Sequence, residues 1–339
     1  MKPKSIKSLL ALALLAPGVL FAQTTAKTTP VGYVSLGDTT SGEPACKPET
    51  DVFISVPVLK SADYTGTVAS ETSGVITLAG SPAFTTGQYS DAAAPYYAVI
   101  QTGAKAGLIG LVTANDAGTI TVSPQPGDSL SGLVAGDVVT LRRAWTVAGL
   151  LGNSLPVGVS LLTFPASGAV NPSAEGIYDW DGTNWVDNVI TGAPADNDVI
   201  YPGETVVLRN STTTPIASLV VSGEVSTFAQ RIPIAAAEEA SDYSVSYFSP
   251  VGEALGNSGL GAVAVAGDAL LGFDNNSSGV NKSASVILDY DGSDWIDNVI
   301  TGAPDNSFEV GAGKGFFFRR GAAGPSAVWS DTAAYVPSL

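Results

Sequence analysis

Acidic and aromatic residues alternate in a motif that the chain contains twice. DGTNWVDNVITGAP begins at Asp181, and DGSDWIDNVITGAP begins 110 residues later. Carboxylates at this density suit a hard cation, because calcium takes about six to eight oxygen ligands. One hypothesis is therefore a calcium site in each copy, and calcium is the only cofactor that the motif suggests. The candidate ligands are Asp179, Asp181 and Asp187 in the first copy and Asp289, Asp291, Asp294 and Asp297 in the second.

The aromatic residues of the same motif have two interpretations. The favoured one is that the rings cover the core of a β-sheet, where a cross-strand aromatic pair contributes a few tenths to about 1 kcal/mol. The other is an exposed platform that stacks on the apolar faces of sugars. The candidate glycan contacts are Tyr178, Trp180, Trp185, Tyr290 and Trp295.

The Asp-Gly pair in each copy predicts a β-hairpin with a two-residue type I′ turn, because both turn positions need a positive φ. That turn would place Trp180 opposite Thr183 and, in the second copy, Asp289 opposite Asp294. Directly opposed like charges destabilise a strand pair. The carboxylates are therefore exposed, or a cation bridges them, or the strands pair in another register.

The repeat extends well beyond the motif. AVNPSAEGIYDWDG from Ala169 matches GVNKSASVILDYDG from Gly279, and GETVVLRN from Gly203 matches GKGFFFRR from Gly313, always at the same offset. A period this long indicates a duplicated unit with its own core rather than a solenoid. The run Phe316–Phe318 is apolar on both faces, which predicts a strand buried from both sides or one that faces a partner.

The composition favours a chain of many short strands. Hydrophobic residues make up 45% of the sequence and charged residues 14%, with 38 Gly and 21 Pro, which is too apolar for a disordered chain. Only residues 235–243 suggest a short helix. We predict an all-β fold in which an N-terminal β-domain precedes two tandem related β-modules, each a sandwich or a small barrel. The expected boundaries are 23–145, 146–235 and 236–339.

The first 22 residues are typical of a secretory signal. Lys2, Lys4 and Lys7 precede a short apolar run that ends at the small residue Ala22. We therefore expect an exported protein, extracellular or on the cell surface, with the periplasm as the alternative, and no membrane span once the signal is removed. The single cysteine, Cys46, excludes an intrachain disulfide.

The chain lacks histidine, and this excludes several kinds of chemistry. Neither a Ser-His-Asp triad, nor a Cys-His pair, nor a histidine metal site can form. The formal net charge of −16 disfavours nucleic acid as a partner, since the field of the whole chain repels phosphate. Two carboxylates alone suffice for a glycoside hydrolase, which remains an alternative. We expect a non-catalytic protein.

Three segments, TPVGYVSL, YDWDGTNW and YPGETVVLR, resemble a family of exported bacterial proteins that has no established activity. The family is recognised by a signal, an early VGY and a repeated DG-x-x-W turn followed by a PG strand. The resemblance implies a β-rich exported protein and carries no activity with it. We expect a structural or adhesive protein of the cell surface or extracellular matrix, with self-association or a surface glycan as its partner. A glycan-binding module is the alternative.

Overall fold

The computed structural model describes residues 29–37, 42–166, 169–189, 192–300 and 302–338. The fold is almost entirely β-structure, which confirms the predicted class. The signal predicted at residues 1–22 lies outside the described residues. Within the described ranges, no helix has the length and apolar character needed to cross a membrane.

Nine strands and one short helix form a unit that we call the first module. Its five-stranded sheet has the order β12-β11-β10-β14-β2. The sheet strands are β2 (Thr50–Ser55), β10 (Val159–Thr163), β11 (Gly176–Trp180), β12 (Trp185–Asp187) and β14 (Thr205–Asn210). Two ribbons complete the module: β1 (Val31–Leu36) with β15 (Leu219–Glu224), and β9 (Trp145–Thr146) with β13 (Val199–Ile200). Helix α1 (Val147–Leu151) follows β9, and Thr146 caps it by accepting a bond from the N–H of Gly149.

The second module contains a sheet with the corresponding strand order, β17-β23-β19-β20-β21. Its sheet strands are β17 (Ser241–Val245), β19 (Ala269–Gly272), β20 (Val286–Tyr290), β21 (Trp295–Asp297) and β23 (Phe316–Arg320). Its ribbons are β16 (Gln230–Ile234) with β24 (Ala327–Asp331), and β18 (Glu253–Ala254) with β22 (Glu309–Val310).

Helical structure in the described part of the chain is otherwise limited to short 3₁₀ turns at Gly103–Lys105, Leu255–Asn257, Leu260–Ala262 and Val336–Ser338. The helix suggested at 235–243 is wrong, because this stretch holds a bridge at Ala237 and then enters β17.

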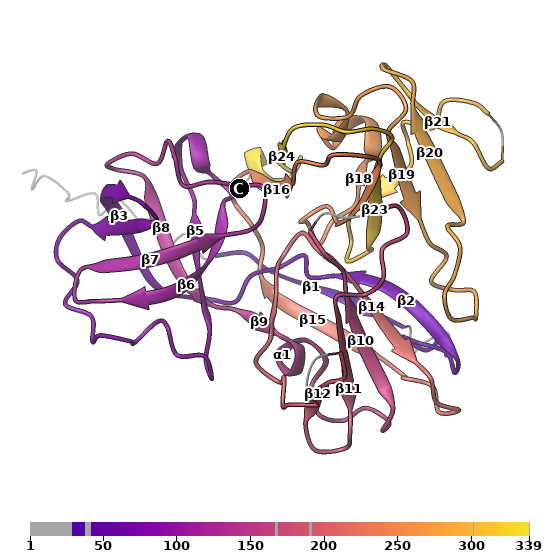
Figure 1. Ribbon diagram of the computed structural model, residues 1–339, viewed down its shortest axis with the longest axis horizontal. Coiled ribbons are helices and arrows are strands. Elements are labelled where there is room, and N and C mark those ends of the chain that lie inside the picture. The colour runs from indigo at the N-terminus through magenta and orange to yellow at the C-terminus, as the bar shows by residue number, and fades with distance from the viewer. Residues whose placement is uncertain (1–28, 38–41, 167–168, 190–191, 301, 339) are drawn as a thin grey trace, which may run out of the picture.

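The remaining six strands close into a small barrel with the order β3-β4-β7-β6-β5-β8. They are β3 (Ala62–Thr72), β4 (Val75–Leu78), β5 (Tyr96–Ile100), β6 (Ile109–Asn115), β7 (Thr119–Pro124) and β8 (Val138–Arg143). The barrel lies in the chain between β2 and β9, and Figure 1 shows β2 beside β14, away from the barrel. Strand pairing therefore groups β1 and β2 with the first module, whereas the sequence analysis placed them in an N-terminal domain ending at 145.

Each unit has its own hydrophobic core, and a further apolar layer joins the two modules. Phe316 and Phe318 point into the core of the second module. Phe317, between them, packs instead against Phe53 and Leu162 of the first module. The alternation follows from the period of two along a strand. The expectation that this run is buried on both faces is confirmed, and its second face meets the other module.

The barrel is fixed to both modules by ion pairs and an apolar contact. Arg142 in β8 pairs with Glu224 of the first module. Arg231 in the second module donates to both carboxylate oxygens of Asp128 in the barrel, with Nη2 at 2.9 Å from Oδ1. Tyr97 is buried in a cluster that contains residues of the barrel and of both modules. These contacts hold the three units together.

Candidate functional site

The repeated hairpins pair in a register different from the predicted one. Trp180 faces Trp185, and Tyr290 faces Trp295, so four residues form each connection. The prediction of a two-residue turn was wrong because Asp181 Oδ1 accepts hydrogen bonds from the N–H groups of Thr183 and Asn184, at 2.7 and 2.8 Å. Asp291 makes the same turn. Asp289 therefore lies opposite Ile296 and not opposite Asp294.

The candidate calcium ligands are all engaged as hydrogen-bond acceptors within the protein. Asp181 and Asp291 accept hydrogen bonds from backbone N–H groups, and these bonds lower the pKa of both carboxyls. The other candidates accept bonds of 2.6 to 2.9 Å from asparagine amides or backbone N–H groups: Asp179, Asp187, Asp289, Asp294 and Asp297. Among the described residues, no group of three or more His, Cys, Asp or Glu side chains is placed to hold a metal ion. Calcium binding stays a prediction.

The aromatic residues of the hairpins belong to the module cores. Trp180, Trp185 and Trp295 are buried, and Trp185 donates its indole N–H to the carbonyl of Gly152 at 3.1 Å. Tyr178 and Tyr290 are half-buried beside them. A buried indole offers no face to a sugar. The three tryptophans are therefore core residues, and their interpretation as glycan contacts is wrong. The interpretation favoured in the sequence analysis describes them.

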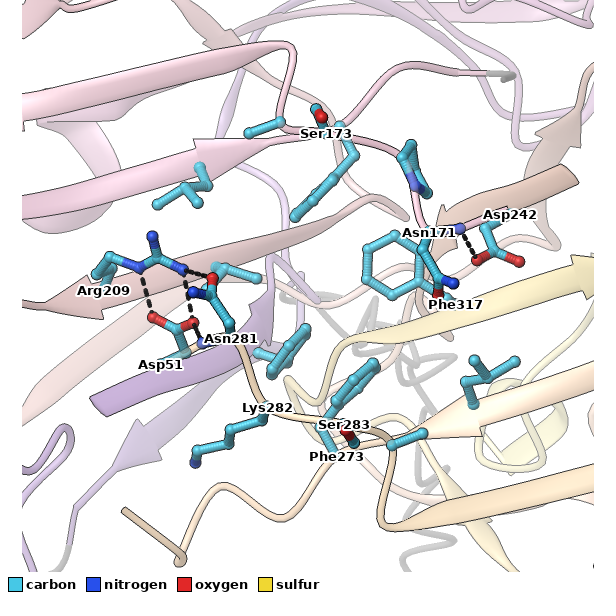
Figure 2. Close-up of a pocket in the computed structure, with 18 of the residues that line it drawn as sticks. Asp51, Asn171, Ser173, Arg209, Asp242, Phe273, Asn281, Lys282, Ser283 and Phe317 are labelled. Carbon is cyan, nitrogen blue, oxygen red and sulfur yellow. Dashed lines mark hydrogen bonds and ion pairs between the residues drawn. The ribbon is translucent and has the colours of Figure 1, made fainter. Parts of the chain in front are cut away.

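A cavity of about 750 Å³ lies between the facing sheets of the two modules (Figure 2). Its wall is apolar and comes from both modules. Phe53 and Phe273 stack in parallel with ring centroids 3.7 Å apart, and Phe317 meets the ring of Phe164 edge-on at 4.9 Å. Further lining comes from aliphatic residues: Leu162, Ala174, Ile177, Val207, Leu271, Ala284 and Ile287.

A three-residue polar cluster stands at one side of this cavity. Arg209 in β14 donates from Nε and Nη2 to the two carboxylate oxygens of Asp51 in β2, at 2.7 and 2.8 Å. Asn281 of the second module completes it: its N–H donates to Asp51 at 2.7 Å, and its side-chain oxygen accepts from Arg209 at 2.7 Å. The bond to Asp51 raises the pKa of Arg209.

The opposite side carries the same cluster with the modules exchanged. Arg319 donates to both carboxylate oxygens of Asp242, at 2.7 and 2.8 Å, and these bonds raise the pKa of Arg319. Here Asn171 of the first module supplies the backbone N–H to Asp242, at 2.7 Å, and accepts from Arg319 at 3.0 Å. Each module therefore completes the cluster of the other, as in the self-complementary contact of a two-fold dimer.

The two asparagines can do this because both adopt a left-handed backbone. Asn171 has a φ of 55° and Asn281 a φ of 52°. Asparagine tolerates this conformation better than most residues. It lets one residue present its N–H and its side-chain oxygen to the same ion pair.

The guanidinium groups and not the carboxylates are the accessible part of each cluster. The Asp51 side chain is 2% exposed and that of Arg209 25%; Asp242 is 3% exposed and Arg319 29%. Nε and Nη2 of both arginines are engaged, whereas Nη1 has no hydrogen-bond partner within the described part of the chain. The cavity is therefore lined by two guanidinium groups with unused donors.

The same interface covers the outer edges of the two sheets. The N–H groups of Asp51 and Ser55 in β2 donate to carbonyls of the second module at 2.9 Å, and Asn275 pairs with both backbone groups of Phe53. Directly after β17, the N–H of Ser246 donates to the carbonyl of Gly203 in the first module at 2.9 Å. Uncovered edges invite pairing with other chains. This interface instead uses them to join the modules.

Sequence reasoning did not single out these clusters, although part of the signal was present. Asn171 and Asn281 occupy matching positions in the repeat, as do Arg209 and Arg319. A polar pair retained at the same offset in otherwise apolar strands indicates a shared role. Nothing in the sequence connects Asp51 to Arg209, because 158 residues separate them.

Comparisons with protein-family models, with curated proteins and with solved structures found no match to this chain. The resemblance to exported bacterial proteins stays a prediction.

Proposed function

We propose that the chain is an exported, non-catalytic structural or adhesive protein of the cell surface or extracellular space, built from a duplicated module. Its contacts to partners are made by the two loops that follow the hairpins. We call these loops the tips; they have the sequence DNVITGAP and begin at Asp187 and Asp297.

The observation that carries the proposal is the exposure of apolar residues in the tips. Val189 is 49% exposed, Val299 50% and Ile300 76%. The tips are identical over eight residues, whereas some buried positions of the modules differ, such as Val207 where the second module has Phe317.

Turn geometry accounts for only part of this identity. Asp297 accepts the N–H groups of Val299 and Ile300, and Gly302 takes a positive φ of 64°. These bonds require the aspartate and favour the glycine, but they place no demand on the valine and isoleucine side chains. Contact with a partner explains why exposed aliphatic residues occur twice, since such residues mark interaction sites when they gather on a surface.

The carboxylates of the two intermodule clusters are unsuited to acid–base catalysis. Asp51 and Asp242, which are both buried, are neutralised by bidentate arginines. A general acid or base needs a carboxyl that can take up or release a proton near the working pH. The partner that we favour is a second copy of the chain, because two identical tips on one molecule allow it to contact two others.

Sedimentation velocity of the mature chain, residues 23–339, tests this proposal. Self-association is expected to strengthen with protein concentration and to weaken in the double variant Val189→Thr/Val299→Thr. Val251→Thr is the matched control, because Val251 is an exposed valine of the second module outside the tips. Equal association of both variants would contradict a role for the tips. Turnover of a glycan by the pure protein would contradict the non-catalytic part.

A further inference from the structure

The intermodule cavity differs in charge from the rest of the chain. Its lining contains three cationic residues, Arg209, Arg319 and Lys282, against two anionic ones, Asp51 and Asp242. The whole chain has a formal net charge of −16. Because both carboxylates are covered while the guanidinium groups are partly exposed, a molecule in the cavity meets the positive charge first.

The cavity also has the size and the apolar character of a small-molecule site. Pockets for such ligands measure roughly 300 to 1,000 Å³ and combine apolar walls with a few placed polar groups. Here four phenylalanines from both modules form the wall: Phe53, Phe164, Phe273 and Phe317. Figure 2 shows the ring of Phe317 between the two polar clusters.

We propose that this cavity binds a small carboxylate with an apolar body. The body lies against the phenylalanine rings, and the carboxylate accepts hydrogen bonds from the unused Nη1 donor of an arginine. Charge-assisted hydrogen bonds from a guanidinium group to a carboxylate are stronger than those between neutral groups. An apolar cation would bind poorly, because the carboxylates of Asp51 and Asp242 are buried and already paired with arginines. An uncharged alcohol would bind less tightly than a carboxylate, because it brings no negative charge to the arginine.

The two ends of the cavity are not equivalent, and the Arg209 end is the better anion site. Lys282 stands beside Asn281, whereas the matching position beside Asn171 is Pro172. Lys282 donates Nζ to the carbonyls of Asp274 and Ser277, at 2.9 and 2.6 Å. It therefore contributes charge to this end while its ammonium group is held by the loop.

Isothermal titration of the mature chain with decanoate, decanol and decylammonium tests the proposal, and phenylbutyrate distinguishes an aromatic from an alkyl body. Decanoate or phenylbutyrate is expected to bind, decanol at least tenfold more weakly, and decylammonium not at all. Binding should weaken as salt is raised, because the attraction is partly screened. No heat with either carboxylate, or equal affinity for decanoate and decanol, would overturn the proposal.

A pair of variants at the rim locates the site without disturbing the ion pairs. Ser283 lines the cavity, is exposed and lies two residues from Asn281. Ser283→Glu places a negative charge at the rim of the cavity and is expected to reduce carboxylate affinity about tenfold. Ser283→Gln, of equal size and no charge, should leave it unchanged. Equal affinity in both variants would place the ligand elsewhere. Neither result depends on self-association through the tips.

Discussion

The exchanged Asp–Arg–Asn clusters predict a specific cost for breaking the contact between the modules. Replacing Arg209 with methionine leaves the carboxylate of Asp51, 2% exposed, without its bidentate partner. Removing one member of a buried ion pair costs roughly 3 to 5 kcal/mol. Arg209 is itself 25% exposed, and Asn281 still donates its N–H to Asp51, so we expect a smaller loss of about 2 to 3 kcal/mol in the free energy of unfolding.

The double variant Asp51→Leu/Arg209→Met should recover much of this loss, because no unpaired charge then remains in the interface. Lys314→Met is the control: Lys314 lies 3.4 Å from Glu309 on the surface, and its loss should cost at most about 0.5 kcal/mol. Urea unfolding of the full mature chain, followed by tryptophan fluorescence, measures all three. A cost for Arg209→Met no larger than that of Lys314→Met would refute the reasoning, as would a double variant less stable than the single one.

Two further predictions concern the carboxyl of Glu204 and the indole of Trp295. Burial raises the pKa of Glu204, which hydrogen-bonds to Gln125 of the barrel, to about 7 from 4.5. The folded state then retains a proton that the unfolded state releases between these values, so stability falls as pH rises through this window and stays lower above it. Glu204→Gln should stabilise the chain by about 1 to 3 kcal/mol near pH 8 and by almost nothing near pH 4, measured from urea midpoints. Equal effects at the two pH values would contradict a raised pKa of Glu204. Trp295→Ala should lower the free energy of unfolding by about 3 to 5 kcal/mol, because it leaves a cavity in the core of the second module. Polysaccharides should not shift the tryptophan fluorescence. A variant as stable as the original chain, or a fluorescence shift, would contradict core burial.

The sequence predicted those features that depend on local pattern. The short apolar runs between Gly and Pro clusters predicted an all-β chain. The continuous apolar run Phe316–Phe318 predicted a strand buried on both faces or one that faces a partner, and Phe317 is buried where the two modules meet. The hairpin register could not be predicted from Asp-Gly alone, because the Asp181 side chain closes a longer turn than the backbone would.

The candidate site was hidden because it is assembled from distant segments. The six barrel strands lie in the sequence between β2 and the other four strands of its sheet. Asp51 and Arg209 are therefore far apart in the sequence although their side chains pair in the fold. The partner asparagine comes from the other module. The predicted domains group segments that are close in the sequence, whereas β1 pairs with β15 and β2 pairs with β14.

The most direct test of the proposed contact surface is cross-linking through cysteines at the tips. Cys46 is buried, so an added cysteine is the only accessible thiol among the described residues. Val189→Cys and Val299→Cys are compared with Val251→Cys, all three at exposed valines, under mild oxidation at the same protein concentration. Disulfide-linked dimers that form readily at the tips and slowly at position 251 are the predicted result. Equal rates at all three positions would contradict the account.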